Sequence, residues 1–397
     1  MNKAEKIILA ALISSASVMA SFISPELSLL KKFFSLDQNQ ISQIMTLYLA
    51  GYLSGQIVWA YASNRIGRLA SIRHGTSISI LGAIIIIASM KTGTFNTFLA
   101  GRILVAFGLS SGLVCGFALI KESLPEAENK KYLSILAVVF TASIYAAILV
   151  SGYIAQLTSL EFIMYMILLY NATMFSLCFC INSIPEPLIM IKKDCHRGKF
   201  ELHPKVIAYS LALSITTIIS YSYALYAPII TSDFFLFSPV EFGLTSLSNM
   251  IFIFLGGMAY LKLNKRFYES AIVSLSLLII IPVCLATLFA SLNYMKLTVF
   301  EFLILCSLLN LASGIIYPAA SYKALEYGSC KATSSAIMNL IKLIMPTIAL
   351  YISPHLGKNE LNTFVLTILL FAVPYVLILQ LIKAPLLKQL CGNKITQ

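Results

Sequence analysis

Apolar segments of about twenty residues recur along the chain, separated by short runs of charged or turn-forming residues. A helix needs roughly 20 mainly apolar residues to cross a bilayer, where it satisfies its own backbone hydrogen bonds. The pattern therefore predicts twelve membrane-spanning helices. They are expected over residues 6–30, 41–62, 73–91, 95–120, 132–158, 161–182, 205–230, 240–261, 269–291, 297–320, 333–353 and 361–383.

The longest polar stretch divides these segments into two sets of six. It contains three prolines and seven charged residues between positions 183 and 204. We therefore predict a six-helix half over residues 1–182, a cytoplasmic linker over 183–204 and a second six-helix half over 205–397. The fold class expected is an all-α membrane protein.

Composition supports a membrane protein. The 397 residues are 59% hydrophobic and 11% charged, whereas soluble domains are about a quarter charged. The mean hydropathy is +0.88. The eight cysteines form no CxxC or histidine-spaced cluster and are expected to be small apolar core residues, so we predict no metal and no cofactor.

The net charge of +12 is a topology signal. Five basic residues fall in the predicted outer segments: Lys31, Lys32, Lys91, Lys296 and Lys358. Arg102 and Lys342 lie within apolar segments, which leaves 21 of the 28 for the inner segments. This asymmetry predicts that both termini are cytoplasmic. A nucleic-acid partner is not expected, because the basic residues are spread over many inner segments rather than one patch.

The sequence disfavours an enzyme. It contains no GxxxxGK[ST] phosphate loop, so transport would draw on an ion gradient or a partner. The histidines His74, His196, His203 and His355 all fall at or near loops, and no acid cluster accompanies them. A membrane sensor is a further alternative, but we would expect it to carry an additional soluble output domain.

A first motif lies where the second apolar segment enters a short inner loop. The chain reads Gly51-Tyr-Leu-Ser-Gly-Gln and then Ala60-Tyr-Ala-Ser-Asn-Arg-Ile-Gly-Arg68. This pattern resembles the signature of the major facilitator superfamily, with Asn64 at the usual aspartate position. Gly67 would permit the tight turn, while Arg65 and Arg68 would hold helix ends and acidic partners. Asn64 can still accept a hydrogen bond, but it cannot form a charge-paired latch.

A second motif is Gly101-Arg102, followed by glycines 108, 112 and 116. The glycines share a helical face and are expected to admit a neighbouring helix closely. A guanidinium inside a span is costly unless it faces protein or water, and the resemblance implies a role for Arg102 in proton coupling. Glu26 is expected at a similar depth and could pair with it. The alternative is that Glu26 reaches the outer headgroups beside Lys31.

Two further stretches are similar to drug:proton antiporters. The stretch from Ser143 to Tyr153 looks like the antiporter motif, although only Gly152 of its proline and two glycines is present. The segments 314–342 and 22–25 are similar to the Bcr/CflA branch, except that Ser21 stands where that branch has an acid. The resemblance implies export, and the eroded antiporter motif leaves nutrient or metabolite import as the alternative.

Lys342 is the leading candidate for substrate binding, because an ammonium midway along a span is expected to face the cavity. Asn339 lies one turn before it and Pro346 one turn after. The alternative is a structural lysine paired with Glu301. Together with Arg102, Lys342 favours an anionic or zwitterionic substrate.

Other polar side chains at helical spacing are candidates for lining the cavity, among them Ser21, Tyr221 and Asn310. For any one of them, a hydrogen bond to helix backbone is the competing interpretation.

The resemblance implies a major facilitator fold with twelve transmembrane helices in two six-helix halves. We expect a monomeric, multi-pass transporter of the bacterial inner membrane that rocks around a midplane site. The expected function is proton-coupled export of a small organic molecule: a drug, an anionic metabolite or a carboxylate siderophore. Its partners would be that substrate, protons and the lipid bilayer.

Overall fold

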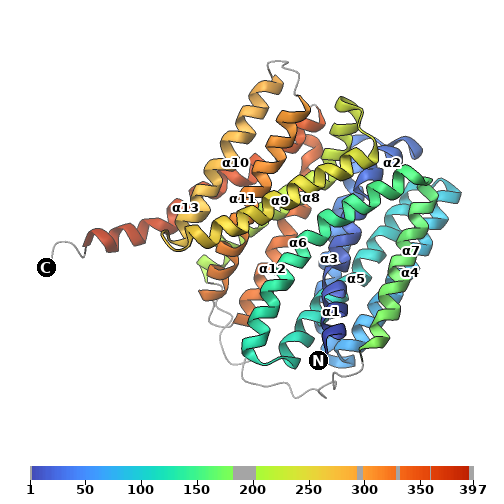
Figure 1. Cartoon of the computed structure of the whole chain (residues 1–397), viewed down its shortest axis with the longest axis horizontal. Helices are drawn as coiled ribbons and strands as arrows, with labels where there is room; N and C mark the ends of the chain where they lie inside the picture. Colours follow the sequence, from blue (N-terminus) through green and yellow to red (C-terminus); the bar gives the residue numbers. More distant parts are fainter. Residues whose placement is uncertain (1, 182–202, 293–297, 328–330, 358, 393–397) are drawn as a thin grey trace. The chain divides into compact units, whose positions relative to one another are not determined.

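The structure is a computed structural model that describes residues 2–181, 203–292, 298–327, 331–357 and 359–392. The first predicted span is a helix with a break, made of α1 (Lys3–Phe22), the 3-10 turn η1 (Ser24–Glu26) and α2 (Leu27–Phe33). Five long helices complete the first set (Figure 1): α3 (Gln38–Ile66), α4 (Arg68–Thr92), α5 (Phe95–Ser123), α6 (Glu126–Leu157) and α7 (Leu160–Leu177).

Six helices make up the second set: α8 (Pro204–Phe235), α9 (Pro239–Leu263), α10 (Glu269–Leu292), α11 (Val299–Glu326), α12 (Lys331–Ile352) and α13 (Glu360–Gly392). The prediction of an all-α membrane fold with twelve helices in two sets of six is therefore confirmed. Ten of the described helices are long and apolar enough to cross a membrane; α3 is not among them, and α6 has only the shorter apolar stretch Ser143–Leu157. The predicted linker lies outside the described residues except for its last two positions.

The chain forms two compact units, each described here by itself. The N-unit comprises Met1–Lys192 and Ala227–Met250, and the C-unit comprises Lys193–Tyr226 and Ile251–Gln397. The segment Ala227–Met250, from the end of α8 to the middle of α9, therefore packs with the first six spans. The predicted domain boundaries place this segment in the second half of the chain, and they stay a prediction.

Glycines let α5 pack closely against its neighbours in the N-unit. A Cβ added at Gly108 would lie 2.3 Å from the carbonyl oxygen of Gly75 on α4. One added at Gly112 would lie 2.3 Å from the carbonyl oxygen of Leu12 on α1. The predicted close approach is confirmed, but it involves two neighbouring helices rather than one. Only glycine fits at these positions, because any side chain would meet backbone.

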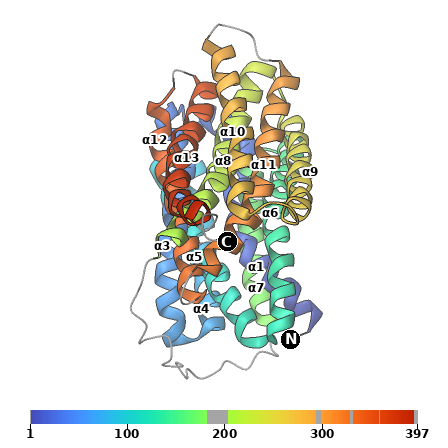
Figure 2. The same ribbon diagram turned by 90° about the vertical axis from the view of Figure 1, so that its left-hand side faces the viewer.

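In the C-unit, α10 lies beside α11 and α13 (Figure 2). Helices α9 and α11 meet through Gly256 and Gly314, whose added Cβ atoms would each lie 2.2 Å from a backbone oxygen of the other helix. Where α11 ends, Lys323 forms ion pairs with Glu269 of α10, at 3.7 Å, and with Glu326. This ion-paired group therefore ties α10 to α11 at the ends that the charge pattern predicts to be cytoplasmic.

Candidate functional site

The break in the first span creates hydrogen-bond acceptors inside the N-unit. Pro25 lacks an N–H and favours an interruption of the helix, and the structure ends α1 at Phe22. The Ile23 N–H is directed to Ser21 O, and the Glu26 N–H turns back to Ile23 O at 3.1 Å. The carbonyl oxygens of Met19 and Phe22 are thereby left for partners outside the helix.

Arg102 of α5 supplies one of those partners. Its side chain is fully buried, and Nη1 donates to Met19 O at 3.0 Å. The guanidinium carbon lies 4.1 Å from the centre of the Tyr48 ring, and the Tyr48 hydroxyl donates to Ala16 O at 2.7 Å. A cation at a helix C-terminus is favourable, and so is a cation over an aromatic ring. Both contacts hold Arg102 against the end of α1.

Ser151 of α6 supplies the other partner. Its hydroxyl contacts Phe22 O and also lies 3.1 Å from Oε1 of Glu26, which is fully buried. A serine hydroxyl has one proton, and a carbonyl oxygen can only accept. If Ser151 donates to Phe22 O, the contact with Glu26 is a hydrogen bond only when the carboxyl carries a proton. This arrangement fits a neutral Glu26.

The expected pairing of Arg102 with Glu26 is not present in the structure. Both residues are described, and no ion pair joins them; Nε and Nη2 of Arg102 and Oε2 of Glu26 have no hydrogen-bond partner among the described residues. The physical reason is that the two side chains lie at different levels along the first span. Arg102 binds at Met19, and the seven residues from there to Glu26 correspond to roughly 10 Å of helix. The expectation that Glu26 reaches the headgroups is also wrong, since it is buried.

Lys342 of α12 lies in a different environment in the C-unit. Its side chain is half-buried, and Nζ donates to the Tyr317 hydroxyl on α11 at 3.2 Å. The ammonium also lies 4.9 Å from the centre of the Tyr317 ring. Glu301, proposed above as a structural partner, caps the start of α11 with Thr298 instead. It lies roughly 24 Å along α11 from Tyr317, so it does not pair with Lys342.

The backbone at Lys342 is held by α8. Pro346 has no N–H, so the carbonyl of Lys342, four residues earlier, loses its helical hydrogen bond. The Thr217 hydroxyl lies 2.9 Å from this carbonyl oxygen and 2.9 Å from Ser214 O on its own helix, and the Ser214 hydroxyl lies 3.2 Å from Ile341 O. Hydroxyl side chains commonly satisfy backbone freed by a proline within a span. Lys342 is thus fixed in position by a proline on its own helix and a threonine on another.

The other predicted substrate-binding residues are less informative. Asn339 is half-buried one turn before Lys342, and Tyr221 is buried on α8. Asn310 donates to Cys306 O on its own helix at 2.8 Å, which matches the competing packing interpretation. Ser21 is buried in the N-unit, and its hydroxyl has no hydrogen-bond partner among the residues that the structure describes. Substrate binding by these four residues stays a prediction.

The loop between α3 and α4 has the geometry predicted for it. Gly67 has φ of 92°, a backbone conformation that favours glycine. Arg68 donates to Asn64 Oδ1 at 2.9 Å, to Ser63, and to Glu122 at the end of α5 at 3.3 Å. Arg65 lies over the Tyr61 ring at 4.7 Å. Asn64 therefore accepts a hydrogen bond from Arg68 as predicted, and Glu122 of α5 provides the negative charge that pairs with Arg68.

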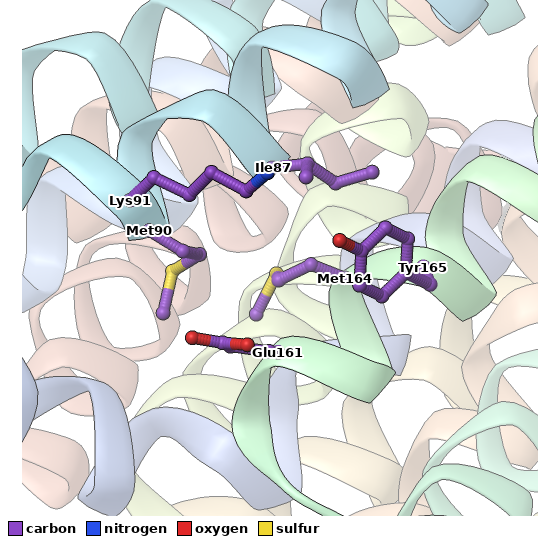
Figure 3. Close-up of a pocket in the computed structure, with 6 residues that line it drawn as sticks. All are labelled: Ile87, Met90, Lys91, Glu161, Met164 and Tyr165. Atoms are coloured by element: carbon purple, nitrogen blue, oxygen red, sulfur yellow. The ribbon is translucent and has the colours of Figure 1, made fainter.

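Residues of the N-unit that the structure describes line two of the protein's pockets. The first is formed by side chains of α4 and α7 (Figure 3), and its lining residues are Ile87, Met90, Lys91, Glu161, Met164 and Tyr165. None of them is a predicted site residue. The second has about 550 Å³ of empty volume. Pro25, Ser28 and Lys32 line one side of it, with residues of the 228–242 segment on the other. One of its lining residues, Pro25, is therefore the sequence neighbour of Glu26.

Within the described residues, twelve long helices, ten of them apolar enough to cross a membrane, indicate a multi-pass membrane protein. A family model described as Major Facilitator Superfamily matches residues 7–350. The chain belongs to the Major Facilitator Superfamily, whose members transport small molecules across membranes. Its assignment to the Bcr/CflA branch stays a prediction.

Solved structures support the same fold. The chain is similar to a D-xylose–proton symporter, with a TM-score of 0.77, 13% identity, and 94% of this chain and 96% of that chain covered. It is also similar to an inward-open structure of the xylose transporter XylE from E. coli, with a TM-score of 0.76 and 14% identity. That match covers 94% of this chain and 94% of that chain. A bacterial homologue of the human lysosomal transporter Spinster matches with a TM-score of 0.69 and 14% identity, over 95% of this chain and 94% of that chain. At these identities the likeness shows the fold alone.

Sequence reasoning missed three residues that complete these sites: Tyr48, Ser151 and Tyr317. It placed Thr217 only among the polar side chains that could line the cavity. The signal for its contact with α12 was Pro346, because a proline in a span predicts a donor elsewhere for the carbonyl four residues earlier. The signal for Ser151 was Pro25 together with the departure from the antiporter motif. Nothing in the sequence pointed specifically to Tyr48 or Tyr317.

Proposed function

We propose that this protein is a proton-coupled secondary transporter that exports a small organic molecule across the bacterial inner membrane, with both termini cytoplasmic. The observation that carries the proposal is Glu26, a carboxyl group buried at the break of the first span. No cation within the described residues pairs with it. A buried carboxylate without a paired cation is costly, so this group is most stable when it holds a proton.

Access to Glu26 supports the same role. A proton carrier needs contact with water in at least one state of the transport cycle. The 550 Å³ pocket reaches Pro25, the neighbour of Glu26, and three of its lining residues are serines. Ser151 contacts both the carboxyl group and the end of α1. Release of the proton would therefore change the hydrogen bonds at the break of the first span.

Arg102 is proposed to assist this coupling. It contacts the end of the same broken helix through Met19 O. Since Nε and Nη2 have no hydrogen-bond partner among the described residues, the guanidinium can form further contacts when the helix end moves. A deprotonated Glu26 would be the strongest local attraction for it.

Purified protein in proteoliposomes tests the proposal. Under an imposed pH gradient, the transporter is screened against cationic dyes, amino acids and polycarboxylates, and the direction of flux separates export from import. Glu26→Gln is expected to abolish gradient-driven transport while substrate exchange without a gradient continues, because glutamine resembles the protonated acid. Glu301→Gln, an exposed cap on α11, is the matched control. Full gradient-driven transport by Glu26→Gln would reject the proposal.

Import is the second candidate. The observation that favours it is the replacement of the antiporter motif's expected residues by Ile148 and Ser151. Substrate accumulation driven by an inward proton gradient, rather than extrusion, would select it.

A further inference from the structure

The pocket between α4 and α7 lies where two spanning helices reach the membrane surface. Lys91 is in the last turn of α4, and Glu161 is in the first turn of α7. The charge pattern of the chain predicts that both of these helix ends are on the outer side. The polar headgroups of a bilayer lie at the ends of spanning helices. The pocket is therefore expected at the level of the outer headgroups.

Two opposite charges line this pocket without pairing with each other. The side chains of Lys91 and Glu161 are both exposed, and among the described residues neither has an ion-pair or hydrogen-bond partner. Figure 3 shows the Lys91 side chain extending toward Ile87 rather than toward Glu161. An ammonium and a carboxylate are thus both available to a ligand that carries the two complementary charges.

Tyr165 adds a neutral donor to the same pocket. It lies one turn after Glu161 on α7 and is 44% exposed. Its hydroxyl points toward the pocket in Figure 3. A phenolic hydroxyl donates readily to a phosphate oxygen. Together with Lys91, it gives an anionic group two donors, while the Glu161 carboxylate accepts from a cationic group.

The helix surfaces that continue from the pocket into the membrane are apolar and exposed. Leu169, one turn after Tyr165 on α7, is 57% exposed, and Ile84, two turns before Lys91 on α4, is 49% exposed. A helix rises 1.5 Å per residue, so both lie roughly 10 Å deeper than the charged groups. A ligand that matches both levels has a charged head and an apolar tail, as a membrane lipid does.

The two charges also restrict the headgroup. A quaternary ammonium has no N–H to donate to Glu161, and an anionic headgroup without an amine would place like charge beside that carboxylate. A phosphate and a primary ammonium joined by a short chain satisfy both side chains, because each forms a charge-assisted hydrogen bond.

We propose that the pocket between α4 and α7 binds the headgroup of a phosphatidylethanolamine lipid. The lipid ammonium donates to Glu161, its phosphate accepts from Lys91 and the Tyr165 hydroxyl, and its acyl chains lie along Leu169 and Ile84. This site goes beyond the proposed function, since it depends neither on the transported molecule nor on proton coupling.

Thermal unfolding of the purified transporter in dodecyl maltoside tests the proposal. The probes are dioctanoyl phosphatidylethanolamine, the phosphatidylcholine and phosphatidylglycerol with the same chains, and free phosphoethanolamine. Apparent affinities follow from the dependence of the unfolding temperature on probe concentration. Phosphatidylethanolamine should bind about fivefold more tightly than the other two lipids, the size of one ionic contact near a membrane surface. Free phosphoethanolamine lacks the chains and should stabilise the protein far less.

Variants locate the effect. Glu161→Gln removes the partner of the lipid ammonium and leaves Lys91 as the pocket's charge, so the preference should change from phosphatidylethanolamine to phosphatidylglycerol. A merely structural role of Glu161 would lower the unfolding temperature without changing this order. Lys91→Met should weaken phosphatidylethanolamine about fivefold. Glu301→Gln is the matched control, because Glu301 is also an exposed glutamate in the first turn of a helix predicted to start outside.

The proposal is overturned if the three lipids stabilise the protein equally, or if Glu161→Gln keeps the preference for phosphatidylethanolamine. It is also overturned if free phosphoethanolamine stabilises the protein as strongly as the lipid, since the ligand would then be a soluble phosphate compound. Should Glu161→Gln fail to fold, Lys91→Met and Tyr165→Phe decide the matter: unchanged affinity for phosphatidylethanolamine in both would reject the site.

Discussion

Arg102 in the N-unit and Lys342 in the C-unit are both cations inside spanning helices, but their surroundings differ. Arg102 is fully buried, and backbone and an aromatic ring hold it in place. Lys342 is half-buried beside a hydroxyl group that has a proton to donate. Arg102 is enclosed by the protein at the end of α1, whereas Lys342 is partly accessible. The comparison separates a cation that holds a helix break from one that protein side chains only partly cover.

The largest effect is expected from Arg102→Ala. The substitution leaves a cavity and removes the donor to Met19 O, so the free energy of unfolding should fall by about 3 kcal/mol. Lys342→Ala should change it by less than about 1 kcal/mol, since that side chain is partly accessible. Thermal unfolding of both variants in detergent provides the measurement. Equal losses would contradict the distinction between the two cations.

Ser151→Ala tests the hydrogen bonds at the break of the first span. It leaves Phe22 O and Oε1 of Glu26 without their shared partner, and a buried acceptor left unpaired costs about 1–3 kcal/mol. We expect a loss of about 2 kcal/mol in unfolding free energy together with weaker proton coupling. Ser89→Ala is the control, because that buried serine donates only within its own helix. A loss no greater than in the control would show that Ser151 does not stabilise the break.

Thr217→Val examines how α8 supports Lys342. Valine keeps the shape of threonine but leaves the Lys342 carbonyl, already freed by Pro346, without a donor. A loss of about 1 kcal/mol in the free energy of unfolding is expected. The control is Thr347→Val, whose hydroxyl donates to Leu343 O on the same helix as Lys342. A loss no greater than in the control would mean that other contacts position the Lys342 backbone.

The smallest effect is expected from Asn64→Asp. An acid at this position would add an ion pair with Arg68, whose side chain is 24% exposed and already pairs with Glu122. Exposed ion pairs contribute about 0–1 kcal/mol, so stability should rise by only a few tenths of a kcal/mol. The gain should shrink as salt is added, because exposed charges are screened. A large gain that persists at high salt would show that the existing Arg68 contacts are weaker than their geometry indicates.

The sequence by itself determined the number of spans, their division into two sets of six, and the identity of the cations within them. These features follow from hydropathy, which is local: each apolar segment crosses the bilayer whatever its neighbours are. The turn at Gly67 and the close packing of α5 were likewise predictable, since a motif or a glycine spacing specifies the backbone directly.

Only the tertiary structure decided which groups meet. Arg102 binds Met19 O rather than Glu26, Ser151 joins Glu26 to the end of α1, and Tyr317 lies beside Lys342. The glycines of α5 serve two helices instead of one for the same reason. A helical period gives the face of each residue, but the rotation and axial level of one helix against another come from packing. At these sites, an axial shift of one helix by a few residues changes which partner a buried charged group contacts.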